Sequence, residues 1–366
     1  MRIIPPDLNS SRARFADWLE ILTLASDAGE VSVSVVRSLL RRASDDRISA
    51  KDLDADGDDT GEPEVTDRAA DDLEERVVEE LVLRSRTVNA AYPFEIKVGG
   101  KLGESQVLKR KATCFDPKTG QLFYTFCLLD SGIRDAIIKV PRDSQALVTQ
   151  IGNIFQICSC IAVGGYTKAQ VVSFGFPRAT GDAFLPALKA VWSKYGSFSV
   201  RPDIPHGFDD KLKDGGIDII AWRPFEDGHA ATFLMFAQVA SGLGWKDKPV
   251  ANDVRAIRQW FVDERFEHFL PAICIPFPLW FDLDEPPRDL LGNRQPYSAG
   301  VLRRFMVRES AFGVIFDRGR IALSCAEAFG GPGGPLNGIE GMDRVDDVSV
   351  WVDRVMQGLA ERRAAA

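Results

Sequence analysis

The stretch Lys213-Asp-Gly-Gly-Ile-Asp-Ile-Ile-Ala-Trp222 decides how the second half of the chain folds. Apolar residues alternate around Asp218, which is the two-residue period of a β-strand. Residues 223–231 are polar and favour a turn, and the apolar run 231–237 then predicts a second, buried strand. The two strands are expected to pair as a β-hairpin.

The hairpin would place two oxygen-bearing side chains close together. Asp218 lies at the start of the first strand and Gln238 near the end of the second, so the two can be neighbours on adjacent strands. Carboxylate and amide oxygens suit a hard cation such as Mg²⁺. Gly215 and Gly216 remove side chains just before Asp218, which would let a phosphate or another backbone come near. The pattern therefore favours a metal site with room for a phosphate.

Asp214-Gly-Gly-Ile-Asp218, the two strands and the following Gln238-Val-Ala240 resemble the PD-(D/E)xK nuclease superfamily, particularly its Mrr-like restriction branch. The resemblance extends over about residues 146–325. It implies an α/β (α+β) fold, with a restriction-endonuclease-like mixed central sheet flanked by helices. It also implies Mg²⁺ (or Mn²⁺) as cofactor and DNA as substrate. The chain departs from the pattern at Ala240, where the superfamily normally has Lys.

The resemblance implies the site residues. Asp218 and Gln238 would hold the metal. Gln156 occupies the helix position that often carries a metal-binding Glu, and its alternative interpretation is a plain polar helix residue. Lys246 or Lys248 would replace the missing lysine from the loop after the second strand, the alternative being two solvated lysines.

Nucleic-acid contacts are expected on the elements that follow. Trp245 is a candidate to stack on a base or sugar, although core packing is the more common role of such a residue. The helix predicted over 250–267 would expose Arg255 and Arg258 to DNA phosphate. One acid of the loop over 203–210 is a candidate to assist the metal.

The remaining chain divides into segments by composition. We expect an N-terminal helical region over 1–90 with an acidic linker at about 45–66, a β-rich accessory segment over 91–143, the nuclease-like domain over 144–330, and a flexible loop with a C-terminal helix over 331–366. The N-terminal helical and β segments together form the expected accessory domain, and no chemistry is predicted for it.

Several elements are predicted from periodicity. Residues 92–97 open a β segment, and residues 144–162 favour a helix with an apolar stripe on one side, formed by Leu147, Ile151, Ile154, Phe155 and Cys158. Residues 9–43 favour two helices, either a simple helical pair or a helix-turn-helix that presents Arg37, Arg41 and Arg42 to phosphate. Residues 107–115 and 121–129 predict a hairpin around the turn signal Asp116-Pro-Lys-Thr-Gly120. Residues 312–323 predict strands separated by a basic turn at 317–320.

Composition limits the class of protein. The 366 residues carry a net charge of −8, which argues against a generally basic nucleic-acid coat. The six cysteines lie mostly in apolar stretches, which indicates buried, reduced thiols. No signal-peptide pattern and no long uncharged apolar run is evident, so we expect a cytoplasmic protein with no membrane contact.

The functional expectation is a metal-dependent DNA endonuclease, acting in restriction or anti-phage defence. The alternative is a catalytically degenerate nuclease fold that binds nucleic acid, or other defence-system subunits, without cutting. By analogy with restriction-type nucleases, which commonly pair subunits to cut both strands, a homodimer is also expected.

Overall fold

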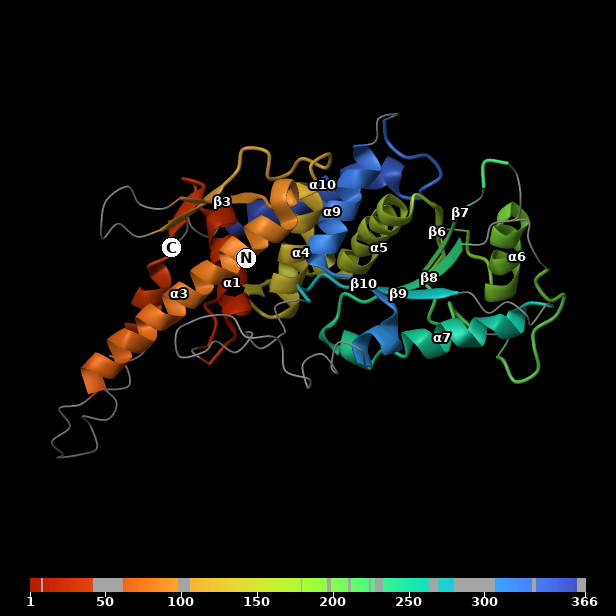
Figure 1. The fold of residues 1–366 in the computed structure, drawn as a ribbon, viewed down its shortest axis with the longest axis horizontal. Helices are drawn as coiled ribbons and strands as arrows, with labels where there is room; N and C mark the ends of the chain where they lie inside the picture. The colour runs from red at the N-terminus through yellow and green to blue at the C-terminus, as the bar shows by residue number, and fades with distance from the viewer. Residues whose placement is uncertain are drawn as a thin grey trace.

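A computed structural model describes residues 1–7, 9–41, 62–97, 106–178, 180–195, 199–209, 212–223, 225–227, 233–262, 269–279, 307–330 and 334–360. The fold is a mixed α/β arrangement (Figure 1). The principal helices are α1 (Arg12–Ala25), α3 (Glu62–Val88), α4 (Gln121–Arg134), α5 (Gln145–Thr167), α6 (Phe184–Tyr195), α7 (Val250–Ala256), α9 (Arg318–Phe329) and α10 (Val345–Ala360). Short helices also cover 35–41 and 307–312, and the 3-10 turns include η3 (Leu243–Asp247) and η4 (Ile257–Trp260).

The strands fall into three sheets. They are β1 (Arg2–Ile3), β2 (Glu30–Ser32), β3 (Phe94–Lys97), β4 (Val107–Arg110), β5 (Ile138–Lys139), β6 (Gln170–Ser173), β7 (Ile219–Arg223), β8 (Phe233–Val239), β9 (Leu270–Cys274) and β10 (Val314–Phe316). The largest sheet has the order β10-β9-β8-β7-β6, and the smaller ones are β1-β5 and β2-β4-β3. In the large sheet β6, β7 and β8 pair antiparallel, whereas β8, β9 and β10 run parallel, so the sheet is mixed.

The large sheet is buried on both faces. Side chains from alternate positions of β7 and β8 enter different hydrophobic cores, as the two-residue strand period requires. Ile219 and Met235 pack on the side of α5 and α9, and Ile220 and Phe236 pack on the side of α6 and α7. Figure 1 shows the sheet between these two helical layers. Burial on both faces explains why the two strands are almost continuously apolar in sequence.

Helices α5 and α9 cross at very short range. A Cβ atom added to Gly165 would lie 1.8 Å from the carbonyl oxygen of Ser324, so only glycine fits at this crossing. The crossing fixes α5 against the sheet, and α5 in turn carries Gln156 toward the end of β7.

A buried ionic cluster joins the first helix to the C-terminal part of the chain. Arg318 binds both carboxylate oxygens of Asp17, at 2.7 and 2.8 Å, and Arg84 binds the same carboxylate at 2.6 Å. Burial alone would raise the pKa of Asp17, but the charges of Arg318 and Arg84 outweigh it and lower this pKa. The cluster ties α1, α3 and α9 together.

One hydrophobic core draws on all four segments that composition distinguishes. It contains Phe15, Phe126, Ile219 and Val352 together with many other buried residues. The ammonium of Met1 also donates a hydrogen bond to the carbonyl of Gly358, which joins the first residue to helix α10. The N-terminal half and the mixed sheet therefore share one interior.

Three secondary-structure predictions were wrong. The predicted strand over 121–129 is helix α4. This helix is buried along nearly its whole length, so its apolar residues do not show the 3.6-residue period of a helix with one exposed face. Residues 30–32 form strand β2, which includes the first two residues of the second helix predicted over 31–42. The predicted turn at 317–320 is the start of α9, because the Asp317 side chain accepts a hydrogen bond from the Arg320 amide and caps the helix.

Other predictions were confirmed by the structure. The hairpin of β7 and β8, helix α5 and strand β3 lie where the sequence places them. The six cysteines are all free and buried.

Arg37, a candidate phosphate contact, instead pairs with Asp71 and Glu74 of α3. Most of the acidic linker at 45–66 lies outside the described residues, and α3 begins at Glu62.

One helix among the described residues is long and apolar enough to cross a membrane, by length and composition alone. It covers Arg142–Thr167, which includes α5, and 56% of its apolar window is buried inside the protein. Such burial is typical of the core helix of a soluble protein.

Candidate functional site

The β7–β8 hairpin places Asp218 and Gln238 at the same end of two neighbouring strands. Ile219 pairs with Ala237 in this sheet, and the amide of Asp218 donates a 2.9 Å hydrogen bond to the carbonyl of Ala237. The paired residues of β7 and β8 end at Ile219 and Ala237, so Asp218 and Gln238 are the next residues along the two segments beyond the last pair. The sequence predicts this juxtaposition, and the hairpin provides it.

The protein backbone and Gln156 fix Asp218 on every side. Its Oδ2 accepts a hydrogen bond from the Val239 amide at 2.7 Å. Its carbonyl accepts from Gln156 Nε2 at 2.7 Å and from the amides of Phe174 and Gly175 at 2.7 and 3.0 Å. A carboxylate held so firmly is pre-organised for a ligand.

The Asp218 carboxyl resists ionisation. Burial raises its pKa to about 6, despite the hydrogen bond from Val239, and the nearby charge of Asp214 adds to the rise. The charge of Lys248 acts in the opposite direction. A bound cation would stabilise the ionised carboxylate, which burial disfavours.

Gln238 is the second buried polar group of the site. Only 2% of the residue is exposed, and its Nε2 donates a 2.6 Å hydrogen bond to Oδ2 of Asp253. Its Oε1 has no hydrogen-bond partner although it is buried. An unpartnered buried oxygen is costly unless something binds it, so this atom indicates a place for a ligand.

Asp253 is a site residue that sequence analysis did not identify. It lies in the first turn of α7, and burial raises its pKa, with Asp214 contributing to the rise. The charge of Lys248 lowers the pKa of Asp253, as it does for Asp218. The signal was present as an acid in the first turn of the helix that follows the hairpin. Only the packing of α7 beside β8 brings the Asp253 carboxylate to Gln238.

The two glycines before Asp218 have different constraints. Gly215 and Gly216 both have positive φ, at +62° and +77°. A Cβ on Gly216 would lie 2.3 Å from Asp253 Oδ2 and 2.7 Å from Gln238 Nε2. Gly216 is therefore required for the turn and also for the close approach of its backbone to the site.

The two candidate lysines differ in position. Lys248 is exposed and close enough to lower the pKa of both Asp218 and Asp253. Lys246 lies over the ring of Trp245, with its Nζ 5.6 Å from the centroid. The electrostatics therefore favour Lys248 as the cation nearest the acids.

The prediction that Trp245 stacks on a base is wrong. Only 4% of this residue is exposed, and its ring packs 5.6 Å from that of Phe312 in the core beneath α7. An indole buried in this way stabilises the fold and presents no face to a ligand.

Helix α7 is shorter than the predicted 250–267, continues through η4, and precedes residues outside the described part of the chain. Arg255 is exposed on it, whereas Arg258 is partly buried. Lys248 and Arg255 both line a hollow of about 590 Å³ between α7 and the short helix over 307–312. This hollow is a basic surface within reach of the site.

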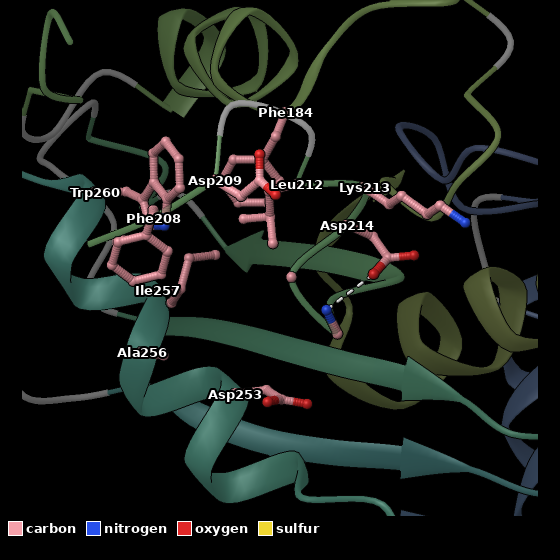
Figure 2. A pocket seen from close by; sticks show the side chains of 12 residues that line it. Phe184, Phe208, Asp209, Leu212, Lys213, Asp214, Asp253, Ala256, Ile257 and Trp260 are labelled. Carbon is pink, nitrogen blue, oxygen red and sulfur yellow. Dashed lines mark hydrogen bonds between the residues drawn. The ribbon is translucent and has the colours of Figure 1, made fainter. Parts of the chain in front are cut away.

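A second cavity, of about 530 Å³, opens beside the acids on the opposite side of α7 (Figure 2). Asp214 and Asp253 stand at its edge, and Gly216 forms part of its wall. Figure 2 shows Asp253 rising from α7 and Asp214 from the loop before β7, with aromatic rings deeper inside the cavity.

The donor set can be tested against a divalent cation. Within the described ranges, no group of three or more His, Cys, Asp or Glu side chains has metal-binding spacing. The candidate donors at this end of the sheet are two carboxylates, Asp218 and Asp253, and the unpartnered amide oxygen of Gln238, which lies beside Asp253. Oxygen-only donors of this kind fit Mg²⁺ or Mn²⁺, which complete their coordination with water and phosphate oxygens.

Comparison of the chain with protein-family models, with curated proteins and with solved structures gives no match.

Proposed function

We propose that this protein is a metal-dependent DNA endonuclease that hydrolyses phosphodiester bonds. The observation that carries the proposal is the buried, unpartnered Oε1 of Gln238, which lies beside the Asp253 carboxylate and at the same strand end as Asp218. Two acids whose pKa values are raised, together with a vacant amide oxygen, form a site suited to a divalent cation.

The arrangement of elements supports a restriction-endonuclease-like fold. A helix that precedes the hairpin, α5, supplies Gln156 behind Asp218, and a helix that follows it, α7, packs beside the mixed sheet. The PD-(D/E)xK resemblance implies both features. We therefore extend the mixed α/β class to this specific fold as part of the proposal.

Asp218, Gln238 and Asp253 would hold Mg²⁺ or Mn²⁺. When bound, such an ion polarises a phosphate oxygen and lowers the pKa of a coordinated water. Gln156 acts as a positioning residue, because its amide nitrogen is engaged by the Asp218 carbonyl and by Ser173.

Lys248 takes the role of the lysine that the superfamily normally has at the position of Ala240. Ala240 is buried in the core beneath α6 and α7, so no ammonium group comes from that strand position. The Lys248 ammonium offsets negative charge near the acids, and such a group stabilises the charge that builds on phosphate as water attacks phosphorus and the P–O bond breaks. Arg255 would contact the DNA backbone from the same hollow.

The biological setting is proposed from the resemblance alone. A restriction-type nuclease would act in the cytoplasm in anti-phage defence, as a homodimer or with other defence-system subunits.

A degenerate binder is the second candidate, and one observation favours it. The superfamily's lysine and helix glutamate are Ala240 and Gln156 here, and Gln156 directs its amide nitrogen at backbone and hydroxyl oxygens. Such a protein would bind nucleic acid or a defence partner without cutting.

Cleavage of plasmid and single-stranded DNA in Mg²⁺ or Mn²⁺ separates the two candidates. Wild type is compared with Asp218→Asn, which keeps an oxygen to accept from the Val239 amide, and with Asp182→Asn, which changes an exposed acid outside the site. The proposal expects cation-dependent cutting by wild type and Asp182→Asn and a loss of at least a hundredfold in Asp218→Asn. DNA binding with no cutting by wild type would establish the degenerate binder.

A further inference from the structure

The cavity beside the site has an apolar floor and an acidic rim. Phe208, Ile257 and Trp260 line its floor, and Asp214 and Asp253 stand on its rim (Figure 2). The rings of Phe208 and Trp260 lie 5.2 Å apart at 62°. Only 2% of Trp260 is exposed, so the partly exposed ring of Phe208 is the aromatic surface that the floor offers to a ligand. Its volume of about 530 Å³ lies within the range of small-molecule sites, roughly 300–1,000 Å³.

The cavity and the proposed catalytic site share a wall. Gly216 and Asp253 line the cavity, and a Cβ on Gly216 would meet both Asp253 and Gln238. A nucleotide whose phosphate lies at Asp218 and Gln238 would therefore carry its base to the mouth of the cavity.

We infer that this cavity binds one unpaired nucleobase, of a kind that bears an exocyclic amino group, from the nucleotide beside the scissile phosphate. The inference rests on the proposed nuclease function and adds a substrate class to it.

The chemistry of the lining selects a base over other groups. A phosphate is disfavoured at the rim, because the carboxylates of Asp214 and Asp253 would repel it. Lys213 also lines the cavity, but its Nζ lies 5.6 Å from the ring centroid of Phe176, which is not part of the lining. An apolar planar ring suits the floor, where base–aromatic contact stabilises binding without requiring a particular sequence. Carboxylates only accept hydrogen bonds at neutral pH, so the rim favours cytosine, adenine or guanine, whose amino groups donate, over thymine.

The base must be unpaired to enter. A base inside a duplex has its hydrogen-bonding edge occupied by its partner and its faces covered by the stack, so it reaches a pocket only by leaving the helix. Single-stranded DNA offers such bases without the cost of unpairing. The cavity therefore predicts a preference for single strands or for locally opened duplexes.

The test is binding of fluorescent oligonucleotides by anisotropy in EDTA, which prevents cutting. Ala256→Phe fills the cavity from its edge, and Gln259→Phe places the same ring on an exposed position nearby that does not line it. We expect Ala256→Phe to weaken single-strand binding about tenfold, the loss of one stacked base, and Gln259→Phe to change it less than about twofold. Equal binding by Ala256→Phe and wild type would overturn the inference.

Base preference gives an independent readout. Wild type should bind an oligodeoxycytidine about fivefold more tightly than an oligothymidine of the same length, and Ala256→Phe should abolish the difference. Equal affinities in wild type would overturn the role of the amino group.

The two proposals fail in different ways. Binding in EDTA does not depend on cleavage, so a cavity that discriminates bases in a protein that never cuts would support the inference while refuting the nuclease. Cation-dependent cutting with no effect of Ala256→Phe on binding would do the reverse.

Discussion

Gln238 Nε2 and Asp253 Oδ2 lie 2.6 Å apart and join strand β8 to helix α7. This hydrogen bond orients the Gln238 amide so that its oxygen is left without a partner. The acid on the helix thereby determines which atom of the strand residue is available to a ligand.

Replacing Asp253 by Ala should therefore damage the site twice, by removing one carboxylate and by releasing Gln238. We expect cation affinity and DNA cleavage to fall at least tenfold, measured by titration and by plasmid nicking. Asp247→Ala, a change of an exposed acid at the end of η3, is the control and should keep both. Wild-type cleavage by Asp253→Ala would remove this residue from the site.

Lys248 and Lys246 should differ in effect although only two positions separate them. Lys248 lowers the pKa of Asp218 and Asp253, whereas Lys246 lies over Trp245. Lys248→Ala is expected to reduce the cleavage rate about 10- to 100-fold, and Lys246→Ala less than about threefold. The opposite ranking in single-turnover assays would place the catalytic lysine at 246.

Gly216 should tolerate no side chain. Its φ of +77° is strained for other residues, and a Cβ would lie 2.3 Å from Asp253. We expect Gly216→Ala to lower the free energy of unfolding by about 2 kcal/mol and to abolish cleavage. Gly242→Ala is the matched control, because nothing lies within 4 Å of a Cβ there and its φ is −88°. Its unfolding free energy should stay within about 1 kcal/mol of wild type, and equal stability of both variants in urea would contradict the geometry.

Asp218 should reduce stability at neutral pH. Its folded pKa of about 6 is above the ordinary value of 3.8, so the folded protein retains this proton after the unfolded chain has released it. Stability from this group is therefore complete below about pH 4 and is lost as pH rises through 6. Asp218→Asn should stabilise the protein by about 1–3 kcal/mol at pH 7 and by much less near pH 4. A pH-independent difference in urea unfolding would rule out the raised pKa.

The local pattern around Asp218 predicted most of what positions the site. Alternation of apolar residues gave the hairpin, and the hairpin placed Gln238 and Asp218 at the same end of adjacent strands. Both are local properties, because strand period and turn length do not depend on the rest of the chain. Helix α5 was also predictable from a local pattern, because its apolar stripe packs on the sheet and places Gln156 beside Asp218 at the start of β7.

The missed features depend on packing between distant segments. The apolar run of α4 could not be distinguished from a strand, because all its faces are buried by other elements. Arg318, expected at a basic turn, is buried against Asp17 from the other end of the chain. Trp245, a candidate to contact a base, is buried in the core. Asp253, which had no predicted role, is placed by α7 beside Gln238.

The most direct test of the metal site is a calorimetric titration of the purified protein with Mn²⁺ at neutral pH, wild type beside Asp218→Asn. It needs no knowledge of the DNA target, so a negative result cannot be attributed to a wrong substrate. The proposed site predicts specific binding by wild type that weakens below about pH 6, as Asp218 takes up its proton, and that Asp218→Asn abolishes. Absence of specific binding, or equal binding by the variant, would contradict the proposal that Asp218 and Gln238 hold a catalytic cation.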